Sequence, residues 1–161
     1  MFQKIPLPVQ AVLKTLTESG FEAYIVGGSV RDLLLSRTPK DWDVATSATP
    51  DQILALFPES FYENDFGTVG VKVKRFSTPL PVSPAPDAEE PKEIIEVTTY
   101  RTESNYIDKR RPETVSFTTS LTEDLARRDF TINALAYGQN RGTWSLVDPF
   151  HGEADLKNKI I

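Results

Sequence analysis

The sequence predicts an α/β (α+β) fold, with a mixed sheet of about five strands and helices mainly on one face. Apolar, partly β-branched segments typical of strands are separated by segments whose apolar residues have helical spacing. A glycine pair joins one such strand to the helix that follows it. With 161 residues, 39% of them hydrophobic, the chain is long enough for one domain with a buried core.

The first half of the chain predicts, in order, a helix, a strand, a glycine turn, a helix, a strand and a helix. These segments span residues 6–20, 21–26, 27–29, 30–35, 41–45 and 49–57. Pro6 and Pro8 open the first helix and Gly20 ends it. Thr49 caps the last of these helices, with Pro50 at its first helical position.

The second half predicts a pair of strands, a basic loop, a long helix and a final strand. These lie at residues 66–76 and 94–101, 106–112, 121–137 and 144–148. The two strands are expected to pair as a hairpin. A Pro-, Ala- and acid-rich connection at residues 77–91, which is unable to continue a ladder of hydrogen bonds, would form its tip.

Composition limits the kinds of site that the chain can hold. There is no cysteine and only one histidine, His151, so thiolate and multi-histidine metal sites are excluded. Any metal is therefore expected to have oxygen ligands, which favours Mg²⁺, Mn²⁺ or Ca²⁺. The net charge of -5 makes the chain an untypical nucleic-acid binder, although a local basic face remains compatible with it.

The sequence also lacks features of membrane and secreted proteins. No apolar run approaches the roughly 18 residues of a membrane span, and the first residues lack the apolar core of a signal peptide. We therefore expect a cytoplasmic protein with no membrane partner.

Asp41 and Asp43 form the first candidate site. Residues two apart on a strand point to the same face, so the two carboxylates are expected to lie together. Two close carboxylates repel each other unless a cation lies between them, and a hard divalent cation satisfies both. The alternative is a pair of solvated acids beside a turn, but the apolar Val44 and Ala45 argue for a half-buried position.

Gly27, Gly28 and Ser29 form the second candidate site, between a strand and a helix. Paired glycines there let a phosphate approach the backbone at the start of the helix, where N–H groups are free. Arg31 would add a charged donor to the phosphate oxygens. A tight turn with solvated charges is the alternative, and the spacing matches neither a Walker A loop nor a dinucleotide fingerprint.

Two further candidates lie downstream. Glu96 is an acid within an apolar strand, and it becomes a third carboxylate at the site if that strand lies beside Asp41; otherwise it faces solvent on an edge strand. Asp129 and Asn133 are four residues apart on the predicted helix of residues 121–137, so they would share a face with Arg128 adjacent. That face would hold a ribose hydroxyl and a phosphate, unless it is simply solvated.

Taken together and in order, these segments resemble the head domain of the class II tRNA nucleotidyltransferases (CCA-adding enzymes) and bacterial poly(A) polymerases, in the polymerase-β superfamily. The resemblance covers about residues 24–148. It is carried by Gly27–Asp32, Pro39–Thr46, Glu96–Arg101 and Arg127–Ala134, and the segment Asp148–Gly152 is similar to the hinge of this family.

The resemblance implies template-independent addition of nucleotides from CTP and ATP to the 3′ end of tRNA. The reaction would be two-metal phosphoryl transfer, with Asp41 and Asp43 holding the Mg²⁺ or Mn²⁺ ions and Glu96 as a third carboxylate. The nucleotide would be bound by Gly27, Gly28, Ser29, Arg31, Arg128, Asp129 and Asn133. Lys109, Arg110 and Arg111 fall in the family's flexible loop and could meet RNA phosphate there, or form a solvated basic turn.

By the same resemblance, residues 1–148 are the catalytic head and residues 149–161 begin the hinge and neck. The family's base-selecting neck motif and its tRNA-binding body are not in the sequence, so we expect a fragment with weak activity alone. The visible residues do not separate CCA-, CC-, A- and poly(A)-adding members.

Two other classes remain open. A hydrolase of the haloacid dehalogenase type also uses two aspartates two residues apart after a strand, together with Mg²⁺. Against it, a strand–glycine–helix unit precedes the aspartates here, and the expected downstream lysine and paired acids are not evident. A non-catalytic nucleotide- or RNA-binding module is the third class, and unchanged, metal-independent ligand binding by Asp41→Ala would support it.

Overall fold

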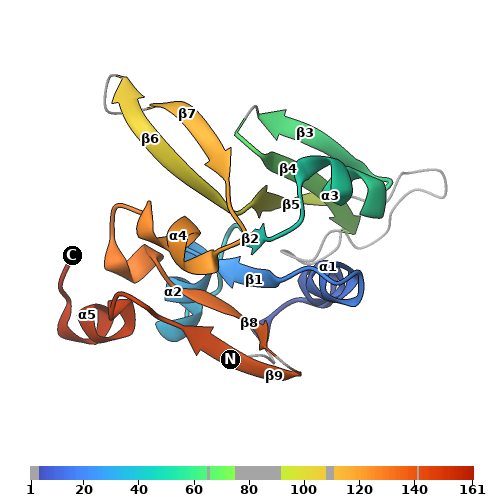
Figure 1. The fold of residues 1–161 in the computed structure, drawn as a ribbon. Coiled ribbons are helices and arrows are strands. Elements are labelled where there is room, and N and C mark those ends of the chain that lie inside the picture. Colours follow the sequence, from blue (N-terminus) through green and yellow to red (C-terminus); the bar gives the residue numbers. More distant parts are fainter. Residues whose placement is uncertain (1–3, 65, 75–91, 108–110, 141) are drawn as a thin grey trace.

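The computed structural model describes residues 4–64, 66–74, 92–107, 111–140 and 142–161. Its largest element is a seven-stranded sheet with the strand order β3-β4-β5-β2-β1-β8-β9 (Figure 1). The strands are β1 (Ala23–Val26), β2 (Asp43–Thr46), β3 (Ser60–Asn64), β4 (Thr68–Lys74), β5 (Lys92–Thr99), β8 (Ala136–Asn140) and β9 (Thr143–Val147). Strands β2 and β5 are parallel and the other neighbours are antiparallel, so the sheet is mixed, as predicted.

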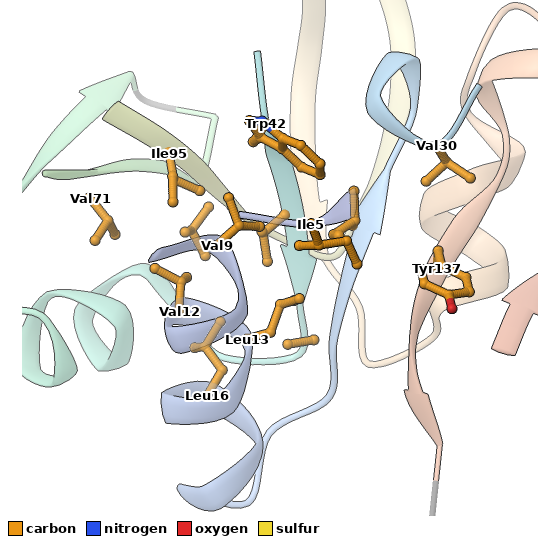
Figure 2. Close-up of a cluster of buried hydrophobic side chains, with 14 of the residues drawn as sticks. Ile5, Val9, Val12, Leu13, Leu16, Val30, Trp42, Val71, Ile95 and Tyr137 are labelled. Atoms are coloured by element: carbon orange, nitrogen blue, oxygen red, sulfur yellow. The ribbon is translucent and has the colours of Figure 1, made fainter. Parts of the chain in front are cut away.

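One face of this sheet carries the main core. Helix α1 (Leu7–Glu18) buries Val9, Val12, Leu13 and Leu16, which follow one another at helical spacing. They pack against sheet residues that include Val71 and Ile95, with the indole of Trp42 in the same cluster (Figure 2). Helices α2 (Gly28–Leu34) and α3 (Pro50–Leu56) contribute Val30, Leu33 and Ile53 to this cluster. The prediction of helices mainly on one face is therefore confirmed.

The opposite face of the sheet is covered only in part. Helix α4 (Leu121–Ala126) places Leu121 and Leu125 in a second cluster with Tyr24, Ala45 and Tyr100. This cluster lies over β1, β2 and the end of β5. Further along the sheet, Ile94 is 51% exposed, so the part of this face formed by β3, β4 and β5 faces solvent.

The predicted long helix at residues 121–137 is wrong. It breaks into α4, a 3₁₀ turn η2 (Thr131–Asn133) and strand β8, which pairs with β1. Phe130, Thr131 and Ile132 are aromatic or β-branched, which disfavours a helix. Leu135 and Ala136 mimic helical spacing with Ile132, but both are buried where the chain enters β8 beside β1.

Several other boundaries differ from the prediction. The sheet has seven strands rather than about five, because β3 and β8 were not foreseen. The hairpin of β4 and β5 is confirmed, while its predicted tip at residues 77–91 lies outside the described residues. The ends of the predicted basic loop at residues 106–112 belong instead to β6 (Arg101–Ile107) and β7 (Arg111–Phe117), which form a two-stranded sheet of their own, and residues 108–110 lie outside the described residues.

The chain leaves the sheet through a tight turn after β9 and enters α5 (Gly152–Asn158). The Asp148 carboxylate accepts hydrogen bonds from the N–H groups of Gly152 (2.8 Å) and Glu153 (3.0 Å). A Cβ at Gly152 would lie 2.1 Å from the Thr131 carbonyl oxygen, so only glycine fits between α5 and η2. Within the described part of the chain, no helix is long and apolar enough to cross a membrane.

Candidate active site

Three acidic residues, Asp41, Asp43 and Glu96, lie near one another on the partly uncovered face of the sheet. Asp43 and Glu96 are direct partners on the parallel strands β2 and β5, so their side chains lie next to each other on one face. Asp41 lies just before β2, and the buried Trp42 between the two aspartates packs into the core on the other side. The expectation that the Glu96 strand lies beside the aspartates is therefore met by the strand order.

The carboxylates perturb one another. Burial raises the pKa of Asp43 above its ordinary value; Arg128 opposes the rise and Asp41 adds to it. Burial also raises the pKa of Glu96, and the negative charges of Glu63, Asp43 and Asp41 add to the rise. The ionised forms of Asp43 and Glu96 are thus disfavoured by burial and by the negative charges nearby, and a cation beside them would offset both effects.

Ser29 ties the start of α2 to the aspartate segment. Its hydroxyl donates a hydrogen bond to the carbonyl of Asp41 (3.0 Å) and accepts one from the N–H of Asp43 (3.3 Å). The side chain is only 2% exposed. In the structure as it stands, Ser29 therefore holds the backbone that carries the two aspartates, rather than presenting its hydroxyl to solvent.

Gly27 brings the backbone and two charged side chains together. Its φ of 69° lies in the left-handed region that favours glycine. A Cβ there would lie 2.9 Å from Nη1 of Arg128 and 3.9 Å from Oδ2 of Asp43. The Arg128 guanidinium therefore occupies the space over Gly27, on the Asp43 side of the turn.

Arg31 connects α2 to η2 beside the same turn. Its Nη1 donates to Oδ1 of Asn133 (2.9 Å), and its Nη2 pairs with Asp32 (2.9 Å). Asn133 thus approaches the site from the 3₁₀ turn rather than from a helix. Asp129 lies exposed in the preceding turn, so the predicted helical face shared by Asp129 and Asn133 does not exist.

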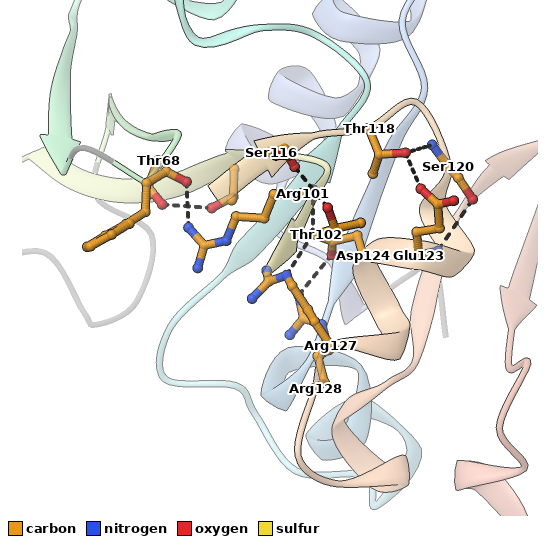
Figure 3. Close-up of polar contacts among 12 residues, drawn as sticks. Thr68, Arg101, Thr102, Ser116, Thr118, Ser120, Glu123, Asp124, Arg127 and Arg128 are labelled. Atoms are coloured by element: carbon orange, nitrogen blue, oxygen red, sulfur yellow. Dashed lines mark hydrogen bonds and ion pairs between the residues drawn. The ribbon is translucent and has the colours of Figure 1, made fainter. Parts of the chain in front are cut away.

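A buried acid that the sequence analysis missed orients Arg128. Asp124 of α4 is fully buried, and its Oδ1 accepts hydrogen bonds from Nε of Arg127 (3.1 Å) and from the N–H of Arg101 (3.2 Å) (Figure 3). Its Oδ2 lies 3.6 Å from Nη2 of Arg128. An acid three and four residues before two arginines was the available signal for this network.

This chain is similar to proteins of known family over nearly its whole length. A family model described as the poly A polymerase head domain matches residues 23–161. The chain belongs to this family. It is 47% identical over 152 residues to a CCA-adding enzyme of Listeria monocytogenes serovar 1/2a, which covers 93% of this chain and 33% of the relative. A CCA-adding enzyme of Streptococcus uberis is 47% identical over 160 residues, covering 99% and 34% respectively.

Solved structures of head-domain proteins share the fold. A Bacillus stearothermophilus CCA-adding enzyme in complex with CTP superposes with a TM-score of 0.70 and 34% identity, over 95% of this chain and 32% of that one. A tRNA nucleotidyltransferase complexed with a primer tRNA and an incoming ATP analog gives 0.65 and 32%, over 93% and 37%. The chain thus spans about a third of the length of the relatives that it matches. These findings do not favour the haloacid dehalogenase alternative.

The head-domain site has room for a ligand beside its acids. A cavity of about 450 Å³ is lined by Lys40, Asp41, Trp42, Asp43, Glu63, Lys92, Glu93, Ile94 and Glu96. Among the residues described here, no three acids or histidines are close enough to hold a metal ion alone. An all-oxygen donor set with raised carboxyl pKa values nevertheless fits a hard cation whose other ligands come from phosphate or water.

Glu63 of β3 is a second residue that the sequence analysis missed. Glu63 lines this cavity, and its negative charge helps to raise the pKa of Glu96. It lies far from Glu96 in the sequence, on a strand that was not predicted. Of the predicted basic residues, Lys109 and Arg110 lie outside the described residues, and Arg111 begins β7.

Proposed function

We propose that this chain is the catalytic head of a template-independent RNA nucleotidyltransferase that adds C and/or A from CTP and ATP to the 3′ end of tRNA. The observation that carries the proposal is the pairing of Asp43 with Glu96 on adjacent parallel strands, with Asp41 beside them and a cationic turn on the other side. The names of the relatives, CCA-adding enzymes, supply the substrate class.

In this proposal the carboxylates bind the metal, and the cationic turn binds the triphosphate. Asp41 and Asp43 hold Mg²⁺ or Mn²⁺, with Glu96 as a third carboxylate; the metal would supply charge neutralisation and acidify the attacking hydroxyl. The backbone of Gly27 and Gly28 and the guanidinium groups of Arg31 and Arg128 bind the triphosphate. No histidine base is required, in keeping with a chain whose one histidine, His151, lies after β9.

The contacts of Ser29 and Asn133 change the roles that we assign to these two predicted residues, whereas Asp129 keeps its proposed role at the sugar. Ser29 positions the aspartate segment through its two backbone hydrogen bonds. Asn133 orients Arg31 through its side-chain oxygen. Asp129 is exposed beside Arg128 and is free to reach the sugar of the nucleotide.

The proposed domain division follows the course of the chain. Residues 1–148 form the catalytic head, and the Asp148–Gly152 turn with α5 begins the hinge toward the neck. The basic residues Lys109, Arg110 and Arg111 would meet RNA phosphate. A protein that matures tRNA in this way is expected to act in the cytoplasm.

The test is incorporation of labelled CTP and ATP into tRNAs that end before, within and after the CCA sequence, by the protein in its natural length with Mg²⁺. Addition that stops after CCA supports a CCA-adding enzyme, whereas unlimited addition of A identifies a poly(A) polymerase of the same family. The matched inactive control is Asp43→Asn. Equal incorporation by this variant would contradict the proposed site.

A further inference from the structure

The carboxylates separate two unlike halves of the site. Strand β2, which carries Asp43, has β1 on one side and β5 on the other. On the β1 side lie the Gly27 turn and the guanidinium of Arg128, so this half is cationic. On the β5 side, the cavity of about 450 Å³ opens along Glu96 and Ile94 toward Glu63 of β3.

Beyond Glu96, the same face of the sheet carries a half-buried aromatic side chain, Phe61 of β3. Phe61, Gly70, Glu96 and Asp43 are successive partners across β3, β4, β5 and β2, so they form one row on one face. Gly70 has no side chain, and the Phe61 ring fills the space above it, 2.6 Å from where a Cβ would lie. The row therefore continues from the carboxylates to an aromatic ring with only glycine backbone between.

Two more side chains complete this surface. Lys72 and Ile94 are direct partners, and each is two residues from a member of the row, so they share its face. The Lys72 ammonium lies 5.5 Å from the centroid of the Phe61 ring, and Ile94 is 51% exposed. We call Phe61, Lys72 and Ile94 the β3–β5 platform.

The in-line geometry of phosphoryl transfer indicates which substrate lies over this platform. This step rests on the proposed function. In phosphoryl transfer the attacking oxygen and the leaving group are roughly in line on opposite sides of the phosphorus. If the leaving pyrophosphate lies on the cationic Gly27 and Arg128 side, the attacking 3′-hydroxyl approaches from the β5 side, over the platform.

We propose that the β3–β5 platform binds the last unpaired nucleotides of the acceptor RNA. An aromatic ring with a cation beside it is the chemistry that binds single-stranded nucleic acid without reading its sequence. Two strand spacings of about 4.8 Å separate Asp43 from Gly70, which is the reach of about three stacked nucleotides at about 3.4 Å each. Lys72 also offsets the repulsion between RNA phosphates and the acids of the site.

The test compares platform variants with a control on the opposite face. Phe61→Leu removes the aromatic ring and Lys72→Gln removes the charge of an exposed side chain. Tyr62→Leu is the matched control, because Tyr62 is a neighbouring aromatic residue, 51% exposed, whose partner Val69 belongs to the core on the other face. Thermal unfolding of each variant shows whether the fold is retained.

Two measurements are made on the full-length protein. The first is the KM for an RNA acceptor and for CTP. The second is direct binding of a short RNA with the fluorescent base 2-aminopurine next to its 3′ end. We expect Phe61→Leu and Lys72→Gln to raise the RNA KM about fivefold or more, to leave the CTP KM within about twofold, and to weaken 2-aminopurine quenching. Tyr62→Leu should match the wild type.

The outcomes separate this inference from the proposed function. Wild-type RNA KM and quenching in both platform variants would overturn the platform while leaving the proposed function intact, provided that Asp43→Asn is inactive. Quenching that depends on Phe61 in a protein without nucleotide incorporation would support the platform and contradict the proposed function. Absence of RNA binding by the wild type would overturn the platform and favour another occupant, such as a protein.

Discussion

At the scale of single residues, the site places side chains where their charges are unfavourable. Asp43 and Glu96 lie side by side, and both have raised carboxyl pKa values. Charged groups that are held close together in a binding site commonly lower the stability of the folded protein. Mutations that remove such a charge should therefore stabilise the fold and abolish the function.

Asp43→Asn should raise the free energy of unfolding of the metal-free protein at neutral pH, because it removes a buried charge whose pKa is raised in the folded state. A carboxyl whose pKa is raised in the folded state favours folding at low pH, and this contribution is lost as the pH rises through the raised pKa. The difference in the free energy of unfolding between the variant and the wild type should thus become smaller toward pH 4. Urea unfolding in a chelator at both pH values measures it, and a less stable variant at pH 7 would contradict the account.

Gly27→Ala should unfold more easily and lose nucleotide binding. An alanine at this position would have to adopt the φ of 69°, which is strained for any residue with a Cβ. Its Cβ would also lie 2.9 Å from Nη1 of Arg128, which is too close. Gly142→Ala is the control, because Gly142 has φ of 83° but nothing within 4 Å of its Cβ. We expect both to lose about 1 kcal/mol of stability from strain, and only Gly27→Ala to lose CTP binding by calorimetry. Equal CTP affinity in the two variants would argue against the turn as a phosphate site.

At the scale of elements, polar anchors hold the site together between segments that are distant in the sequence. Asp124 links α4 to the first residue of β6, and Arg31 links α2 to η2. The links from Asp124 to Arg101 and from Arg31 to Asn133 were not predictable, because they join segments distant in the sequence and because helical spacing favoured a helix through Tyr137, which would have placed Asn133 differently. The pairing of β8 with β1 overrode that local preference.

Asp124→Ala should be among the most damaging single substitutions outside the carboxylate site. It removes the carboxylate oxygen to which the N–H of Arg101 and Nε of Arg127 donate, and it removes the negative charge 3.6 Å from Nη2 of the half-buried Arg128. Removing one partner of a buried ion pair typically costs about 3–5 kcal/mol. Urea unfolding measures the loss. A change below about 1 kcal/mol would show that the network is dispensable.

At the scale of the whole molecule, the mixed sheet is what turns local motifs into a site. The sequence allowed prediction of the turn at Gly27, the aspartate pair and the strand of Glu96, because each has a local pattern. The contribution of Glu63 and of Phe61 was not predictable, because β3 lacks clear alternation and reaches the site only through the strand order. Long-range pairing therefore determined the part of the site that local patterns missed.

The most direct measurement of the central claim is Mn²⁺ binding in the presence of CTP, followed by electron paramagnetic resonance of the free ion. The account predicts that the wild-type protein with CTP removes more free Mn²⁺ than CTP alone, and that Asp43→Asn and Asp41→Asn do not. Equal Mn²⁺ binding by the wild type and both variants would contradict a metal site at these carboxylates.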